Sequence, residues 1–335
     1  MKNLFRLLLV LILVAAGAVA YIWFSRPADV VFDAVRNEVP HAAFSRFADL
    51  DGLRVHYQEK GSGPALILIH GYTSLAYTWK DVFDEFAKSY HTIAIDLKGH
   101  GFTGKPDGDY TMPAQAALVT KLMDHLKIDQ AILCGNSMGG AVSLMTAINY
   151  PQKVKGLILV DSAGIVNTGA HKPLTDDVIK WPVLGPAFAA LALTSDSIVR
   201  DGMKRAYVDP AMITEERVAA YWRPVKTRSG QQAMILVKRQ WDMSPIEQSL
   251  GKVHQPALLI WGAEDQIIPL DTGKKMNSLI TGSQMLVFDK CGHSPQEEMP
   301  ERFAREALNF AAHLTAPASN PAALTATAKP GGFQP

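Results

Sequence analysis

A serine between two glycines is the first feature of this sequence that could carry chemistry. The stretch Gly135 to Gly139, with Ser137 at its centre, follows the apolar run Ala131 to Cys134 and precedes a helix-like stretch. Small residues on both sides of the serine are typical of a sharp strand-to-helix turn, whose flanks pass close together. The spacing therefore predicts that Ser137 is a nucleophile, although a structural serine in a glycine-rich turn would give the same pattern.

A serine nucleophile needs a base to accept its proton and a carboxylate to orient that base. In parallel sheets, functional residues gather at the carboxyl ends of the strands. Asp265 follows the apolar run Ala257 to Gly262, and His293 follows the run Gln284 to Phe288. We therefore expect Asp265 as the acid and His293 as the base that act on Ser137.

Other residues compete for these two roles. Glu264 is adjacent to Asp265, and Asp161 also follows a predicted strand, so either is an alternative acid. Asp265 itself has a structural interpretation, because Asp commonly caps the helix that follows it. His100 is a rival base, but its neighbouring glycines fit a tight turn better than a catalytic loop.

The developing oxyanion needs two N–H donors. We expect one from Met138, directly after the nucleophile, and the other from Tyr72, in the loop after the apolar run 65–70. The side chain of His70 is expected to brace this loop rather than to take part in the reaction.

The elements that must position these residues alternate between buried strands and helices. Strands are predicted at 47–50, 53–57, 65–70, 91–96, 131–136, 156–161, 256–262 and 284–288, and helices at 79–88, 113–127, 137–150 and 300–313. The first two strands flank Asp51-Gly52, a typical hairpin turn. The alternation predicts an α/β protein with a mostly parallel sheet and helices on both faces.

The region from about 165 to 250 interrupts this alternation. It has no buried-strand pattern, yet it is too long for a structureless loop in a compact domain. We expect a helical cap inserted over the carboxyl edge of the sheet.

The N-terminal 24 residues have the pattern of a membrane anchor or a signal peptide. Lys2 and Arg6 precede an apolar run of 18 residues, Leu7 to Phe24, which is the lower length limit for a spanning helix. Ala18-Val19-Ala20 also has the form of a signal-peptidase site. The flanking charge predicts a cytoplasmic N-terminus. The expected location is therefore a bacterial inner membrane, single-pass with the catalytic body on the periplasmic side, or the periplasm or exterior after cleavage at Ala20.

The remaining boundaries follow from composition. Residues 25–43 are expected to be a linker, 44–314 the main domain with its cap, and 315–335 a disordered tail rich in Ala, Pro and Thr. The net charge is +1 and basic runs are absent, which argues against a nucleic-acid partner. The two cysteines, Cys134 and Cys291, are expected to be small buried apolar residues, and no spacing in the sequence indicates a metal or cofactor site.

Together, these motifs resemble the α/β-hydrolase superfamily over roughly Phe47 to His313. The resemblance rests on His70-Gly71-Tyr72, Asp96 to Gly101, Gly135 to Gly140, Trp261 to Asp265, and Gly292-His293. It implies about eight strands with a cap after the sixth, and a triad in the chain order Ser137, Asp265, His293.

Within the superfamily, the chain looks most like membrane-anchored or secreted bacterial serine esterases and lipases. The resemblance implies hydrolysis of apolar acyl esters or lipids without a cofactor. A serine at position 137, where haloalkane dehalogenases carry aspartate, argues against dehalogenation. The alternatives are a carbon–carbon bond hydrolase, against which the export signal speaks, a cofactor-free haloperoxidase or perhydrolase, and a non-enzymatic ligand-binding or signalling protein of the same fold.

Overall fold

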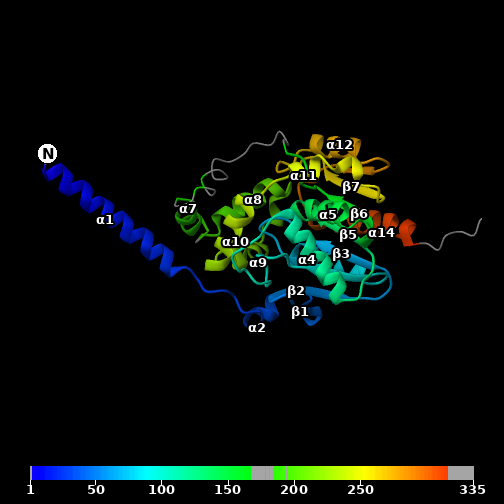
Figure 1. Ribbon diagram of the computed structural model, residues 1–335, viewed down its shortest axis with the longest axis horizontal. Coiled ribbons are helices and arrows are strands. Elements are labelled where there is room, and N and C mark those ends of the chain that lie inside the picture. Colours follow the sequence, from blue (N-terminus) through cyan, green and yellow to red (C-terminus); the bar gives the residue numbers. More distant parts are fainter. Residues whose placement is uncertain (1, 167–177, 179–180, 182–183, 194, 316–335) are drawn as a thin grey trace, which may run out of the picture.

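The computed structural model describes residues 2–166, 178, 181, 184–193 and 195–315, and an eight-stranded sheet lies at its centre (Figure 1). The strand order is β1-β2-β4-β3-β5-β6-β7-β8. The strands are β1 Ser45–Leu50, β2 Leu53–Lys60, β3 Ala65–Ile69, β4 His91–Ile95, β5 Ala131–Asn136, β6 Val154–Val160, β7 Ala257–Gly262 and β8 Gln284–Phe288. All eight predicted strands are confirmed.

The sheet is parallel except at one edge. β1 pairs antiparallel with β2, and β2 pairs antiparallel with β4, whereas the other pairs are parallel. Asp51 and Gly52 form the β1–β2 turn with φ values of 55° and 81°, as the hairpin prediction requires. The residues of β3, β5 and β7 are buried throughout, because apolar side chains cover both faces of the sheet.

Helices connect the parallel strands and follow the last one, β8. They are α3 Phe83–Phe86, α4 Met112–His125, α5 Met138–Asn149, α12 Leu270–Leu279, α13 Pro295–Glu298 and α14 Pro300–Thr315, with the 3-10 turns η3 Ala76–Trp79, η4 Pro151–Lys153 and η6 Leu250–Lys252. The helical stretch predicted around 79–88 is found as two short pieces, η3 and α3. The backbone N–H of Ala76 donates to the Asp96 carboxylate at 2.7 Å, so a long-range contact fixes the start of η3.

A helical insertion lies between β6 and β7, as expected for a cap after the sixth strand. Its described elements are α7 Leu184–Ala192, α8 Ser197–Ala206, η5 Pro210–Met212, α9 Glu215–Val225, α10 Arg228–Arg239 and α11 Ser244–Glu247. The hydroxyl of Tyr72, in the loop after β3, donates to the Met234 carbonyl of α10 at 3.1 Å. The insertion therefore contacts the carboxyl edge of the sheet.

The N-terminal helix α1, Lys2–Ser25, extends away from the sheet and contacts α7 (Figure 1). Within the described residues, Lys2–Tyr21 is the one helix long and apolar enough to cross a membrane. The segment after α1 is fixed to α10, because the Arg228 N–H donates to the Pro27 carbonyl at 3.0 Å. The expected linker, 25–43, contains α2 Phe32–Val35, η1 Arg36–Glu38 and η2 Ala42–Phe44. The expected tail lies outside the described residues from 316 onward.

Candidate active site

Ser137 occupies a sharp turn between β5 and α5. Its backbone has φ 55° and ψ −118°, a conformation that residues other than glycine rarely adopt. The end of β6 holds this turn, since the Ser137 N–H donates to the Val160 carbonyl at 2.9 Å and the Ala163 N–H donates to the Ser137 carbonyl at 2.9 Å. Ser137 is only partly buried, whereas both of its neighbours in the chain are buried. The turn therefore presents a serine side chain at the carboxyl edge of the sheet.

The two glycines of the motif are required by close packing. A Cβ atom on Gly135 would overlap the carbonyl of Gly139, and one on Gly139 would overlap the carbonyl of Ile69 in β3. The strand, the turn and the first turn of α5 are thus in contact through their backbones, which is the geometry that the small-residue spacing predicted.

His293 and Asp265 form a buried pair. The Nδ1 atom of His293 lies 2.7 Å from Oδ2 of Asp265. The other oxygen, Oδ1, accepts hydrogen bonds from the N–H groups of Ile267 at 2.7 Å and Ile268 at 3.0 Å. Asp265 therefore caps the turn that follows it and also contacts the imidazole. It does not cap α12, because the N-cap of that helix is Pro269. With Nδ1 donating to Asp265, Nε2 is the nitrogen free to accept a proton from a serine.

Asn136 links this pair to the serine turn. Its side-chain amide donates to the His293 carbonyl at 3.0 Å and to the Val160 carbonyl at 3.2 Å. The structure thereby brings the His293 loop beside the turn that carries Ser137. The sequence reasoning missed Asn136, and the one local signal was a polar residue at the end of an otherwise apolar strand.

Acidic and cap residues hold the other side of the His293 loop. The Gly292 N–H donates to Glu298 Oε1 at 2.9 Å, and the Val208 N–H donates to Glu298 Oε2 at 2.9 Å. The His293 N–H donates to the carbonyl of Ala206, the last residue of α8. These contacts were also missed, because nothing in the sequence pairs a cap helix with a loop near the C-terminus.

His70 braces the loop after β3, as predicted. Its Nδ1 lies 2.7 Å from the Gly71 carbonyl, and its Nε2 accepts the Leu97 N–H at 3.0 Å, which places the proton on Nδ1. A Cβ atom on Gly71 would lie 3.1 Å from the Ser137 Cβ, so this loop passes directly beside the serine. The assignment of the Tyr72 N–H and, at the start of α5, the Met138 N–H as oxyanion donors stays a prediction.

The rival residues occupy different surroundings. Glu264 is exposed, and its side chain has no hydrogen bond to His293 among the described residues. His100 is buried in its tight turn, with Nδ1 3.1 Å from the Lys98 carbonyl, and burial followed by the nearby His70 lowers its pKa to about 3. Asp161 is fully buried at the end of β6 and lies beside Asp265.

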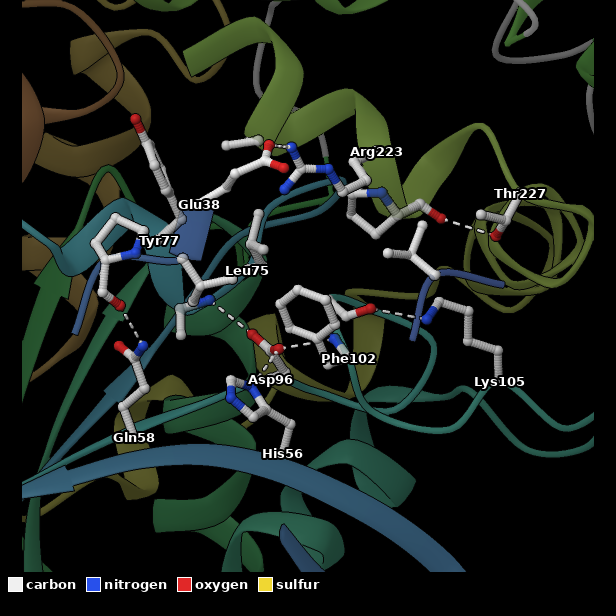
Figure 2. A pocket seen from close by; sticks show the side chains of 17 residues that line it. Glu38, His56, Gln58, Leu75, Tyr77, Asp96, Phe102, Lys105, Arg223 and Thr227 are labelled. Carbon is white, nitrogen blue, oxygen red and sulfur yellow. Dashed lines mark hydrogen bonds and ion pairs between the residues drawn. The ribbon is translucent and has the colours of Figure 1, made fainter. Parts of the chain in front are cut away.

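A solvent-open pocket lies apart from this site (Figure 2). The segment after α1, the loop after β4 and helix α9 line it, and none of Ser137, Asp265 and His293 does. Its charged groups have partners: His56 Nδ1 lies 2.7 Å from Asp96 Oδ2, Arg223 pairs with Glu38, and Lys105 donates to the Gly101 carbonyl at 2.8 Å. Although burial opposes it, the facing His56 holds the pKa of Asp96 well below its usual range. The Arg223–Glu38 pair joins the segment after α1 to the cap.

Comparison with known proteins gives a consistent result. A family model described as alpha/beta hydrolase fold matches residues 64–300. The chain is 32% identical over 274 residues to the 2-hydroxymuconate semialdehyde hydrolase of Pseudomonas sp. (strain CF600), covering 80% of this chain and 93% of that protein.

Two solved structures are similar over most of the chain. The meta-cleavage product hydrolase from Pseudomonas fluorescens IP01 is 26% identical with a TM-score of 0.68, covering 80% of this chain and 97% of that one. A membrane phospholipase A is 24% identical with a TM-score of 0.70, covering 94% of this chain and 99% of that one. At that identity the second likeness is one of fold.

Proposed function

This chain belongs to the α/β-hydrolase family, and from that premise we propose that it is a serine hydrolase that cleaves carboxylic esters of apolar acyl groups or lipids. The observation that carries the proposal is the 2.7 Å contact between His293 and Asp265, held beside the Ser137 turn through Asn136. A nucleophile, a base and an orienting acid are the three groups that acyl transfer through an acyl-enzyme requires.

The first half of the reaction forms the acyl-enzyme. The Ser137 oxygen attacks the ester carbonyl while His293 Nε2 takes the hydroxyl proton. Asp265 holds the imidazole in the correct tautomer and stabilises the imidazolium. The N–H groups of Tyr72 and Met138 would bind the oxyanion of the tetrahedral intermediate. This intermediate collapses as the imidazolium gives its proton to the leaving alcohol.

The second half releases the acid. A water molecule attacks the acyl-enzyme carbonyl while His293 again accepts a proton. The second tetrahedral intermediate expels the Ser137 oxygen, which regains its proton from the imidazolium. One ester and one water thus give one alcohol and one carboxylic acid, and the enzyme returns to its starting state.

The apolar part of the substrate is proposed from the surroundings of the site. Helix α1 has the length and hydropathy of a membrane span and contacts α7, an apolar helix of the insertion with an exposed Leu191. A body anchored in this way would meet acyl esters at a lipid surface. We propose a single-pass inner-membrane protein with its catalytic body on the periplasmic side. A full-length chain that elutes as a monomer from size-exclusion chromatography without detergent would contradict the anchor.

Carbon–carbon bond hydrolysis is the second candidate. The observation that favours it is the 32% identity to a 2-hydroxymuconate semialdehyde hydrolase over most of both chains. The predicted triad serves either reaction, so the substrate must decide between them.

A parallel assay of both substrate classes tests the proposal. Purified full-length protein is given p-nitrophenyl esters of increasing acyl length and, separately, 2-hydroxymuconate semialdehyde. We expect kcat/KM to be higher for the esters and to rise with acyl length over the shorter members, with both activities lost in Ser137→Ala. Faster turnover of the semialdehyde than of every ester would replace the proposed function with the second candidate.

A further inference from the structure

We propose that Asp161 is held as a neutral carboxylic acid that donates a hydrogen bond to Asp265, and that it thereby acts as a positioning residue for the Asp265–His293 pair. Among the described residues, Asp161 has no hydrogen bond to Ser137, and its proposed action on the reaction passes through Asp265. The inference deepens the proposed function, on which its role in turnover rests.

Asp161 lies at the end of β6, next to the strand end that leads to Asp265. One carboxylate oxygen of Asp161, one of Asp265 and one imidazole nitrogen of His293 lie within 4.8 Å of one another, and all three residues are buried. The two carboxyl groups therefore lie side by side at the ends of the neighbouring strands β6 and β7. Two carboxylates this near each other in a buried site cannot both carry a charge at low cost, which favours a proton held by the pair.

The hydrogen bonds decide which aspartate carries that proton. Asp265 accepts three N–H donors, from His293 Nδ1, Ile267 and Ile268, so both of its oxygens already act as acceptors. Asp161 accepts one, from the Gly262 N–H to Oδ1 at 2.9 Å. Its Oδ2 atom is buried and has no donor among the described residues, as expected for an oxygen that is itself the donor.

The other ionisable groups that face Asp161 also favour its neutral form. Glu298, which binds the Gly292 N–H, adds a further acidic group, and the Cys291 thiol is buried nearby. Burial, then Asp265, and more weakly Glu298 raise the pKa of the Asp161 carboxyl well above its usual range. His293 is the one basic group of this cluster, and its Nδ1 is already engaged by Asp265. A metal ion held by these three residues would have to displace that imidazole proton.

A neutral Asp161 would hold Asp265 at a fixed orientation without adding a second charge beside the imidazole. The acid O–H occupies one lone pair of Asp265, and the Gly262 contact fixes the acid itself. An ionised Asp161 would instead repel Asp265 and disturb the orientation of His293. Asparagine reproduces the neutral acid, because its amide can donate to Asp265 and its carbonyl can accept from Gly262.

Infrared difference spectroscopy tests the proton directly. The spectrum of full-length wild type in detergent micelles minus that of Asp161→Asn at neutral pH should contain the carbonyl band of a protonated carboxylic acid, shifted in D₂O. The matched control is Asp271→Asn, at an exposed residue of α12, whose difference spectrum should contain carboxylate bands and the bands of the new amide but no acid carbonyl band. A difference spectrum of Asp161→Asn with carboxylate bands and no acid carbonyl band would overturn the inference. Failure of Asp161→Asn to fold would do the same, because the amide should replace the acid.

Thermal unfolding and ester turnover provide a second test of the role of Asp161. In the folded protein Asp161 keeps a proton that the unfolded chain loses near pH 4. The melting temperature of wild type should therefore fall, relative to that of Asp161→Asn, as pH rises from 4 to 8. A difference independent of pH would contradict the shared proton. In ester turnover, Asp161→Ala should lower kcat/KM about 10- to 100-fold, as loss of a hydrogen bond to a charged group predicts, and Asp161→Asn should recover most of it. Equal losses in both variants would overturn the positioning role.

The two proposals fail in different ways. If Ser137 is not the nucleophile, wild type turns over no ester, but the acid band and the pH-dependent stability difference remain. If Asp161 is ionised, ester turnover by wild type remains and the acid band is missing.

Discussion

The backbone N–H of His293 donates a 2.7 Å hydrogen bond to the carbonyl of Ala206, the last residue of α8. On its other side, the His293 carbonyl accepts the Asn136 side chain at 3.0 Å. The candidate base is therefore held between the helical insertion and the serine turn. Because α8 reaches His293 through a backbone contact, a shift of the insertion would be transmitted to the imidazole.

The buried Arg217–Glu297 ion pair should stabilise this arrangement. Arg217 Nε, on α9, lies 3.0 Å from Glu297 Oε2, on α13 directly after the His293 loop, and both side chains are buried. We expect Arg217→Met to lower the free energy of unfolding by about 3 kcal/mol, at the low end for buried pairs because Tyr207 and Thr78 still donate to Glu297.

The control for this prediction is an exposed pair on the same insertion. Arg200, on α8, pairs with Asp196 and Glu215, and its loss in Arg200→Met should cost less than about 1 kcal/mol. Chemical denaturation of both variants measures the difference. Equal costs would show that the buried pair does not hold the insertion to the His293 loop.

Asp265→Asn should lower kcat on esters by about three to four orders of magnitude. An amide in place of the carboxylate cannot both accept the Nδ1 proton and stabilise an imidazolium, so His293 would adopt the wrong tautomer. Asp271→Asn is the matched control, because Asp271 is exposed on α12 and should leave kcat unchanged. Retention of more than about a tenth of the wild-type kcat in Asp265→Asn would mean that another acid, with Asp161 the nearest, orients the imidazole.

Acid should destabilise the protein partly through His100. Its pKa in the folded protein is about 3 and that of the unfolded chain is about 6.5, so unfolding takes up a proton between these values. Stability from this residue is therefore present above pH 6.5 and is lost as pH falls toward 3, at about 1.4 kcal/mol per pH unit for one proton. His100→Gln should show a shallower fall in melting temperature over this range. Parallel curves would contradict a neutral buried His100.

Gly139→Ala should prevent formation of the serine turn. The added Cβ would overlap the carbonyls of Ile69 and His70, which are backbone atoms of a buried strand end and cannot move aside. We expect loss of several kcal/mol of stability and of ester turnover together. Gly202→Ala is the control, since the space around Gly202 on α8 is open and alanine favours the helix by about 0.5–1 kcal/mol. A Gly139→Ala variant with wild-type stability would contradict the close packing of β3 against α5.

The sequence patterns predicted the sheet well because its strands are buried on both faces. A short continuous apolar run such as Ala65–Ile69 is typical of a parallel strand that is buried on both faces. The strand ends then placed Asp265 and His293 correctly relative to one another, since parallel strands align their carboxyl ends. The helical stretch at 79–88 was less predictable, because the 3-10 turn η3 starts before it, at Ala76, whose N–H binds the side chain of Asp96, and α3 covers only Phe83–Phe86.

The hydrogen bonds that hold His293 could not be predicted from local sequence patterns. Asn136 and His293 are separated by 157 positions in the chain, and their hydrogen bond depends on how β5 and the loop after β8 meet in three dimensions. The contact of Ala206 with His293 depends in addition on where the insertion folds back over the sheet. Asp161 was visible as an alternative acid, but its relation to Asp265 required the order of β6 and β7 in the sheet.

Covalent labelling of the serine tests the central claim most directly. Full-length protein is treated with a fluorophosphonate probe, which reacts with an activated serine, and the adduct is mapped by peptide mass spectrometry. We expect one adduct, on Ser137, that is absent in Ser137→Ala and unchanged in Ser278→Ala, an exposed serine of α12. An unlabelled wild type, or an adduct that persists in Ser137→Ala, would contradict it.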